Sequence, residues 1–255
     1  MYHSISEVDT EASHPYYQTN TPPAVFADHL KALHDEGYSA IPLSEAALRL
    51  RSGERLKRSV VITFDDGFAD LIEIAFPIMT RFGFTGTVFL PTSYIGDEPM
   101  RFKNRLCLNW RQVRELHHSG VTFGSHSKTH RVLHSLPTAE LEEELVGSKR
   151  VIEDKLGSAV DTFSYPYAFP GVRHSFKNTL RDLLLKAGYA HGVTTTIGTA
   201  NPGEDTLFLK RLPINGHDDP AFFSSKLCGS YDWMGLPQYL VKSLKSMALA
   251  VSDCK

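Results

Sequence analysis

The stretch VVITFDDGFAD, residues 60–70, places two aspartates and a glycine directly after a run of apolar, β-branched residues. The run predicts a buried strand, and an Asp-Gly pair commonly forms a turn. Neighbouring side chains on a strand point to opposite faces. Asp65 and Asp66 can therefore face one site only at the strand's end, where Gly67 permits a tight turn. Taken alone, the stretch fits either an ordinary solvated turn or a site that needs two carboxylates for different tasks.

Strand-like and helix-like segments alternate along the chain. The expected strands are short and apolar: Tyr2–Ile5, Ser39–Pro42, Ser59–Phe64, Thr85–Leu90, Val121–Gly124, Thr162–Tyr165, His191–Thr195 and Phe208–Leu212. The expected helices are Pro22 to Gly37, residues 138–157, Asp182 to Lys186 and Leu236 to Ala250. This alternation predicts an α/β fold with a parallel sheet, doubly wound or closed into a barrel, and 255 residues fit a single barrel domain over 1–255. In a barrel, functional groups gather at the carboxyl ends of the strands.

Composition and charge argue against several classes of protein. The net charge of −2 and the pI near 6.6 are unlike those of a nucleic-acid or membrane-surface protein. No apolar run reaches the ~18 residues of a membrane span, and the first residues lack the features of a signal peptide. We therefore expect a soluble, cytoplasmic protein. Cys107, Cys228 and Cys254 show no metal-binding spacing and are expected to be free thiols.

The segment HSKTH places His126 and His130 four residues apart, directly after an expected strand. On a helical turn this spacing brings both rings to one face, as in many zinc-binding histidine pairs. One aspartate and two histidines make a three-ligand site with positions left open, which is typical of a catalytic metal. A cation would also relieve the repulsion between two close carboxylates and leave the second aspartate available as a general base.

The segment FSYPYAFPG, residues 163–171, follows the sixth expected strand. Pro166 fixes its own backbone and restricts the residue before it, so Tyr165 to Tyr167 should form a stiff turn. Such a turn can present a backbone N–H to a site, as an oxyanion hole requires.

Taken together, TFDDG and HSKTH resemble the motifs of the polysaccharide deacetylases of the NodB-homology family, carbohydrate esterase family four. The resemblance implies that Asp65 is the general base and that Asp66, His126 and His130 bind a metal, most often Zn²⁺, with Co²⁺, Ni²⁺ or another divalent ion as substitutes. It also implies that the backbone N–H of Tyr167 binds the oxyanion and that the fold is a distorted (β/α)7-type barrel.

The opening YHSI resembles the branch of the family that includes deacetylases of poly-N-acetylglucosamine and other exopolysaccharides, and implies that His3 lies near the metal. Many family members carry an arginine where this chain has Ser164, and Arg211 is the expected substitute. The family's late Leu-x-His motif, which provides the general acid, is not cleanly present. The nearest candidate is His217 in LPINGHDD.

The resemblance implies a metal-dependent hydrolase that removes N-acetyl groups from an N-acetylated sugar, whether polysaccharide, oligosaccharide or precursor. The alternatives are a related enzyme for a small cyclic amide or an O-acetyl group, and a glycan-binding protein without activity. Trp110, Trp233 and Tyr231 are candidates for stacking against a sugar ring, although such residues more often pack in the core or at the rim.

Overall fold

The structure is a computed structural model that describes residues 1–7, 18–170 and 173–238. The expected helix from Leu236 to Ala250 lies almost wholly outside the described residues, and so does Cys254. Cys107 and Cys228 are free, as expected.

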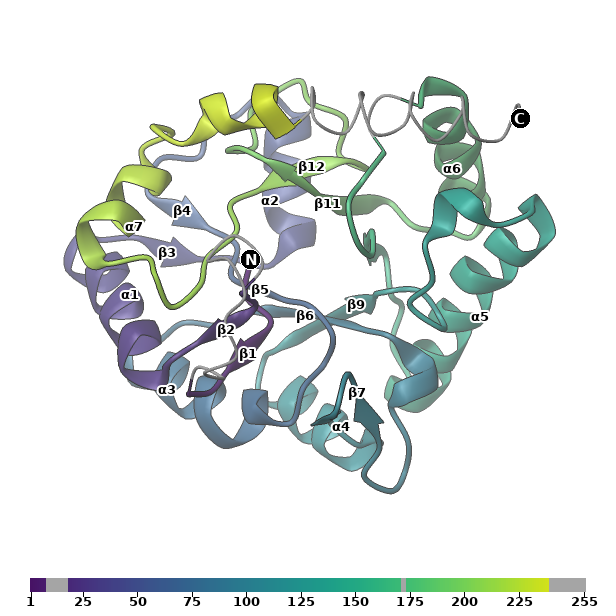
Figure 1. The fold of residues 1–255 in the computed structure, drawn as a ribbon, viewed down its shortest axis with the longest axis horizontal. Coiled ribbons are helices and arrows are strands. Elements are labelled where there is room, and N and C mark those ends of the chain that lie inside the picture. The colour runs from purple at the N-terminus through teal and green to yellow at the C-terminus, as the bar shows by residue number, and fades with distance from the viewer. Residues whose placement is uncertain (8–17, 171–172, 239–255) are drawn as a thin grey trace, which may run out of the picture.

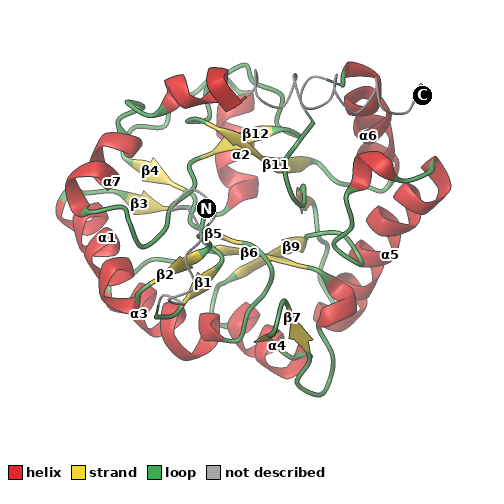
Figure 2. Ribbon diagram, viewed as in Figure 1, coloured by secondary structure: helices red, strands yellow, loops and turns green. Residues whose placement is uncertain are grey.

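Short strands and longer helices alternate through the described chain (Figure 2). The strands are β1 (Ser4–Ile5), β2 (Asn20–Thr21), β3 (Ser39–Ala40), β4 (Ser59–Val60), β5 (Thr63–Phe64), β6 (Thr87–Leu90), β7 (Arg101–Phe102), β8 (Arg105–Leu106), β9 (Thr122–Ser125), β10 (Thr162–Ser164), β11 (His191–Ile197) and β12 (Leu209–Arg211). The α-helices are α1 (Pro23–Asp35), α2 (Leu43–Arg51), α3 (Phe76–Arg81), α4 (Trp110–His118), α5 (Thr138–Leu156), α6 (His174–Lys186) and α7 (Pro220–Leu227).

Six of the strands form a curled parallel sheet in the order β12-β11-β10-β9-β6-β5. The helices surround this sheet, with α1, α3, α4, α5 and α6 arranged around its outside (Figure 1). Tyr2 continues the sheet beyond β5, because its N–H donates to Thr63 and its carbonyl accepts from the N–H of Asp65. The arrangement confirms the expected (β/α) barrel-type fold, in which parallel strands end at one shared face.

Residues 59–64, expected as one strand, divide their pairing between two neighbours. β4 pairs with β3, whereas β5 pairs with β6. The partner strand changes because the two neighbours are staggered along the chain. The carbonyl of Val60 accepts from the N–H of Ile41 on one side, and the carbonyl of Ile62 accepts from the N–H of Thr87 on the other. The result is a short β5 that ends directly at Asp65.

The helix ends follow local sequence rules. α1 begins at Pro23, where a proline fits the first helical turn. α5 ends before Gly157, whose φ of 66° is a left-handed conformation that glycine adopts at little cost. Among the described residues, no helix is both long enough and apolar enough to cross a membrane.

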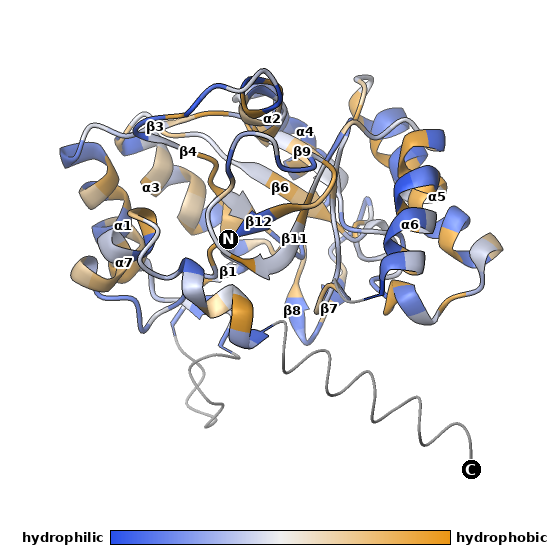
Figure 3. Cartoon of the chain, turned by 90° about the horizontal axis from the view of Figure 1, so that it is seen from above, coloured by the Kyte–Doolittle hydropathy of each residue, from blue (hydrophilic) through white to orange (hydrophobic). Residues whose placement is uncertain are grey.

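The antiparallel hairpin β7–β8 was not expected from the sequence, because its strands are only two residues long. Its turn residues Lys103 and Asn104 have φ values of 50° and 61°, as a two-residue hairpin turn requires. In Figure 3 the hairpin projects from the lower edge of the molecule, the edge on which β1 also lies. β8 and the residues after it hydrogen-bond to the chain that follows Asp66. The N–H of Leu108 donates to the carbonyl of Gly67, and the N–H of Ala69 donates to the carbonyl of Leu106.

Candidate active site

The turn after β5 brings Asp65 and Asp66 to the same site. Both side chains are buried. Gly67 has a φ of 63°, and Asp66 itself has a φ of 71°, so the turn needs two left-handed residues rather than the glycine alone. A Cβ on Gly67 would lie 2.8 Å from Leu90, and this close packing adds a second reason for glycine here.

The segment between His126 and His130 is an irregular loop, and the helical turn expected from the spacing is wrong. Ser127 and His130 have φ values of 66° and 55°, which no α-helix contains. The buried side chain of Glu144 on α5 holds the loop, because its Oε2 accepts from the backbone N–H groups of Lys128 and Thr129, each at 2.8 Å. The two rings nevertheless meet, with centroids 4.8 Å apart.

Asp66, His126 and His130 form a buried cluster in which one ligand atom from each lies within 4.8 Å of the others. Asp66 Oδ1 is 3.2 Å from His130 Nε2 and 3.6 Å from His126 Nε2. His126 Nδ1 donates to the carbonyl of Ser164 at 2.8 Å, which leaves Nε2 free to bind a cation. Burial lowers the pKa of His126 to about 4, so the ring is neutral at pH 7, as a metal ligand must be.

The residues of this cluster fit a divalent metal. Asp66 Oδ1 and His130 Nδ1 are buried polar atoms without a hydrogen-bond partner in the described part of the chain, and such atoms normally have one. Burial opposes the charge of Asp66, but His130, His3 and Lys103 outweigh burial and hold the pKa of Asp66 well below its ordinary value. A neutral imidazole pair with one carboxylate is a common zinc donor set.

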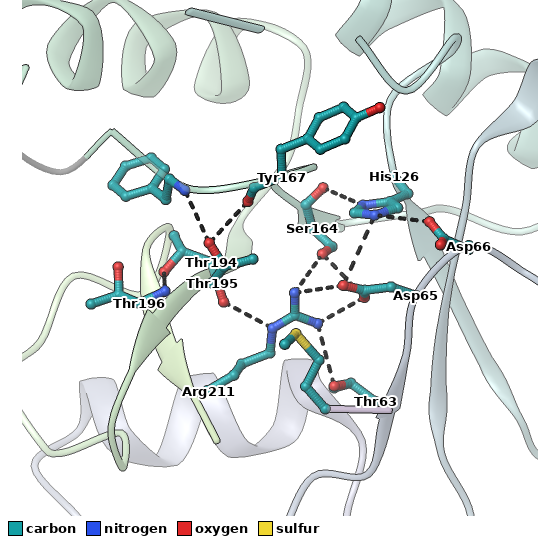
Figure 4. Close-up of polar contacts among 12 residues, drawn as sticks. Thr63, Asp65, Asp66, His126, Ser164, Tyr167, Thr194, Thr195, Thr196 and Arg211 are labelled. Atoms are coloured by element: carbon teal, nitrogen blue, oxygen red, sulfur yellow. Dashed lines mark hydrogen bonds and ion pairs between the residues drawn. The ribbon is translucent and has the colours of Figure 1, made fainter. Parts of the chain in front are cut away.

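Asp65 is held by Arg211 from the end of β12 (Figure 4). The guanidinium binds both carboxylate oxygens, with Nη1 2.8 Å from Oδ1 and Nη2 2.7 Å from Oδ2. Nη2 also donates to the hydroxyl of Ser164 at 3.0 Å, and Nε donates to the carbonyl of Thr194 at 2.9 Å. Burial disfavours the charge of Asp65, yet Arg211 and His126 outweigh burial, so the pKa of Asp65 lies well below its ordinary value.

Tyr167 lies in a turn beside the cluster. Its φ is 58°, its side chain is 47% exposed, and its ring centroid is 4.6 Å from that of His130. The buried Pro166 precedes it. Thr195 on β11 holds this turn: its hydroxyl donates to the carbonyl of Tyr167 and accepts from the N–H of Phe169, both at 2.9 Å (Figure 4).

His3 lies beside the two aspartates, because Tyr2 pairs with the backbone on either side of Phe64. Burial lowers the pKa of His3, and the charges of Asp66 and Asp65 act in the opposite direction. A role for His3 in the site stays a prediction.

The other residues singled out from the sequence have unlike surroundings. His217 is exposed, and its Nε2 contacts the side chain of Gln18 at 2.8 Å; no contact described for it reaches the metal-binding cluster. Trp110 follows the core-packing alternative, because it is buried at the start of α4. Tyr231 packs against Phe222, whereas Trp233 is 62% exposed.

A cavity of about 620 Å³ lies beside the site, on the side of α2. Thr63 and Arg211 line this cavity, but the three residues of the metal-binding cluster do not. The cavity is therefore distinct from the space around the metal-binding side chains.

Three residues that organise the site were not found from the sequence: Lys103, Glu144 and Thr195. Glu144 carried a signal, because it lies on the apolar stripe of its helix with Leu141 and Leu145. Lys103-Asn104 carried a weaker one, as a two-residue turn candidate after Phe102. Thr195 carried none, since threonine is ordinary in a strand.

Comparison with known proteins gives consistent relatives. Residues 52–192 match the family model described as polysaccharide deacetylase. The protein YxkH of Bacillus subtilis is 30% identical over 224 residues, which cover 87% of this chain and 73% of YxkH. The poly-β-1,6-N-acetyl-D-glucosamine N-deacetylase of Staphylococcus aureus is 25% identical over 209 residues, covering 77% of this chain and 67% of that enzyme.

A solved structure shares the fold. The Streptococcus pyogenes deacetylase PplD, determined in complex with acetate, superposes with a TM-score of 0.77 at 23% identity, covering 88% of this chain and 95% of PplD. At this identity the likeness supports the barrel-type fold.

Proposed function

The chain belongs to the polysaccharide deacetylase family, and we propose that it is a metal-dependent hydrolase that removes the acetyl group from an N-acetylated sugar. The observation that carries the proposal is a buried Asp-His-His cluster next to a second carboxylate held by an arginine. One carboxylate oxygen of the cluster has no hydrogen-bond partner among the residues that the structure describes. This arrangement separates metal binding from proton transfer.

We propose that Asp66, His126 and His130 hold the metal, with Zn²⁺ as the first ion to test. When bound, a divalent ion supplies Lewis-acid chemistry, which polarises the amide carbonyl and lowers the pKa of water. The three side chains leave coordination positions for water and substrate, as catalytic sites do.

Asp65 is the proposed general base. Its Oδ2 is 3.9 Å from His126 Nε2, so the carboxylate lies beside the cluster without belonging to it. Arg211 fixes the carboxylate and keeps it charged, and Asp65 accepts the proton of the attacking water.

The backbone N–H of Tyr167 is the proposed donor to the oxyanion, because Thr195 holds its turn next to His130. The exposed ring of Tyr167 offers an apolar face to a sugar. His3 replaces His217 as the proposed donor of the proton to the leaving amine, because His3 follows Tyr2, which pairs with the backbone next to Asp65, whereas His217 is exposed and contacts Gln18.

The substrate class follows from the relatives. The Staphylococcus aureus relative is named for poly-β-1,6-N-acetyl-D-glucosamine, so we propose β-1,6-linked N-acetylglucosamine oligomers as the first substrates to test. A precursor sugar is the alternative if the enzyme is cytoplasmic, as the sequence predicted.

The test is acetate release from these oligomers by chelated protein, with and without added Zn²⁺. We expect release only with the metal, and a loss of about 10²–10⁴-fold in Asp65→Asn, the range typical of a removed general base. Asp97→Asn, which changes an exposed aspartate, is the matched control. Undiminished release by Asp65→Asn would reject the assigned base. Release from O-acetyl or cyclic amide substrates alone would favour the rival reactions.

A second variant tests the proton donor. His3→Gln should lower kcat while the Zn²⁺ content of the purified protein stays at the wild-type level, because His3 is not among the three cluster residues. A wild-type kcat in this variant would return the question to His217.

A further inference from the structure

The two oxygens of Asp66 face different partners. Oδ1 faces the imidazoles of His130 and His126, at 3.2 and 3.6 Å. Oδ2 is 3.0 Å from the ammonium group of Lys103, at the tip of the β7–β8 hairpin. One oxygen is therefore left for a cation, while the other already has a charged partner.

The hairpin fixes where this ammonium group lies. Lys103 is a left-handed residue, a conformation that is unfavourable for a non-glycine residue and is tolerated where the surroundings impose it. Phe102, beside it, is buried, and its ring centroid lies 4.3 Å from that of Tyr94 and 4.9 Å from that of His130. The ammonium group lies 4.7 Å from the centroid of Phe102 and 5.8 Å from that of Tyr167.

A lysine in this place has two electrostatic consequences. Its charge opposes the binding of a second cation nearby, because Asp66 is buried and the interaction is only partly screened. Its hydrogen bond also withdraws electron density from the carboxylate, so Asp66 becomes a weaker donor through Oδ1. Partners of this kind around a ligand tune the metal they surround.

We propose that Lys103 is a positioning residue of the metal centre. It directs Asp66 to bind the metal through Oδ1 alone. It also weakens Asp66 as a ligand, which lowers the affinity for the metal and makes the bound metal a stronger Lewis acid. The proposal rests on the metal site of the proposed function. It predicts effects of opposite sign, because loss of the lysine charge should strengthen metal binding and weaken turnover. If Lys103 only held Asp66 in place, its loss would leave Asp66 disordered, and both Zn²⁺ affinity and kcat would fall.

The experiment compares Lys103→Met and Lys103→Arg with the wild type. Zn²⁺ affinity is measured on chelated protein by competition with a chromophoric chelator, and kcat and KM on the same metal-loaded preparations. We expect Lys103→Met to bind Zn²⁺ about tenfold more tightly, because a repelling charge is removed. We also expect it to lose about tenfold or more in kcat, a loss typical of residues that surround metal ligands. Lys103→Arg should stay close to the wild type in both.

Lys155→Met is the matched control. Lys155 is also half-exposed, lies 3.0 Å from an aspartate and lies over an aromatic ring, but its partner Asp97 is exposed and lies outside the metal-binding cluster. This variant should keep wild-type affinity and kcat.

An unchanged or weakened Zn²⁺ affinity in Lys103→Met, or an unchanged kcat, would overturn the proposal for Lys103. If the wild type binds no Zn²⁺, or if Asp66→Asn binds it as the wild type does, the metal site and the proposal for Lys103 both fail. The two failures are therefore separable.

Discussion

The adjacent aspartates at the end of β5 lie in two unlike halves of the site. The half around Asp65 consists of strand ends, and the protein supplies its partners: Arg211 binds both oxygens and Ser164 joins the pair. The half around Asp66 consists of a loop and a hairpin, and within the described residues it contains buried polar atoms without a hydrogen-bond partner. This difference fits the proposed function, in which the protein itself completes the surroundings of the base and a cation completes the metal-binding half.

The largest expected effect comes from breaking the first half. Arg211→Met leaves the Asp65 charge buried without its partner, so we expect a loss of about 3–5 kcal/mol in the free energy of unfolding. Arg181→Met removes the partly exposed pair with Asp205 and should cost no more than about 1 kcal/mol. Urea denaturation of metal-free protein measures both. Equal losses would mean that Arg211 does not hold the base half together.

Adding metal should complete the second half. At a Zn²⁺ concentration of about 100 times Kd, binding to the folded state alone raises the free energy of unfolding by about 2.7 kcal/mol. Asp66→Asn should abolish this gain, because it removes the carboxylate that faces both imidazoles. Denaturation with and without chelator measures the gain. A full gain in Asp66→Asn would place the ion elsewhere.

The smallest effect concerns the loop of the metal-binding half. Glu144→Gln weakens the hydrogen bonds that hold Lys128 and Thr129, so we expect about 1 kcal/mol less stability and about tenfold weaker Zn²⁺ binding. Glu143→Gln is the control, because this neighbour forms only an exposed pair with Lys128. Competition with a chelator measures the Zn²⁺ affinity of both variants. Matching affinities would show that Glu144 does not position the ligands.

The sequence predicted which residues form the metal-binding cluster, but it predicted the backbone around Asp65 better than the backbone of the loop that carries the histidines. Strand ends follow from apolar runs, so the positions of Asp65, Ser164 and Arg211 relative to the sheet could be expected. The loop with the left-handed residues Ser127 and His130 could not be expected. Glu144 accepts from the backbone N–H groups of Lys128 and Thr129, and Ser127 Oγ accepts from the N–H of His130. Spacing alone does not reveal such bonds.

The hairpin and the late histidine show the same limit. Two-residue strands leave almost no periodicity, so the approach of Lys103 to Asp66 had no sequence signal beyond its turn. His217 was chosen because it is near a family motif in the sequence, and the structure places it on the surface. Nearness to a motif in the sequence therefore does not predict nearness to the site in the folded protein.

The pairing of Arg211 with Asp65 joins residues 146 positions apart. Contacts of such long range form late in folding, because closing the intervening chain costs entropy before the contact repays it. During synthesis the ribosome releases Asp65 long before Arg211 is made. We therefore expect the barrel to acquire its reactive carboxylate only when the last strand docks, so that catalytic competence reports completed folding.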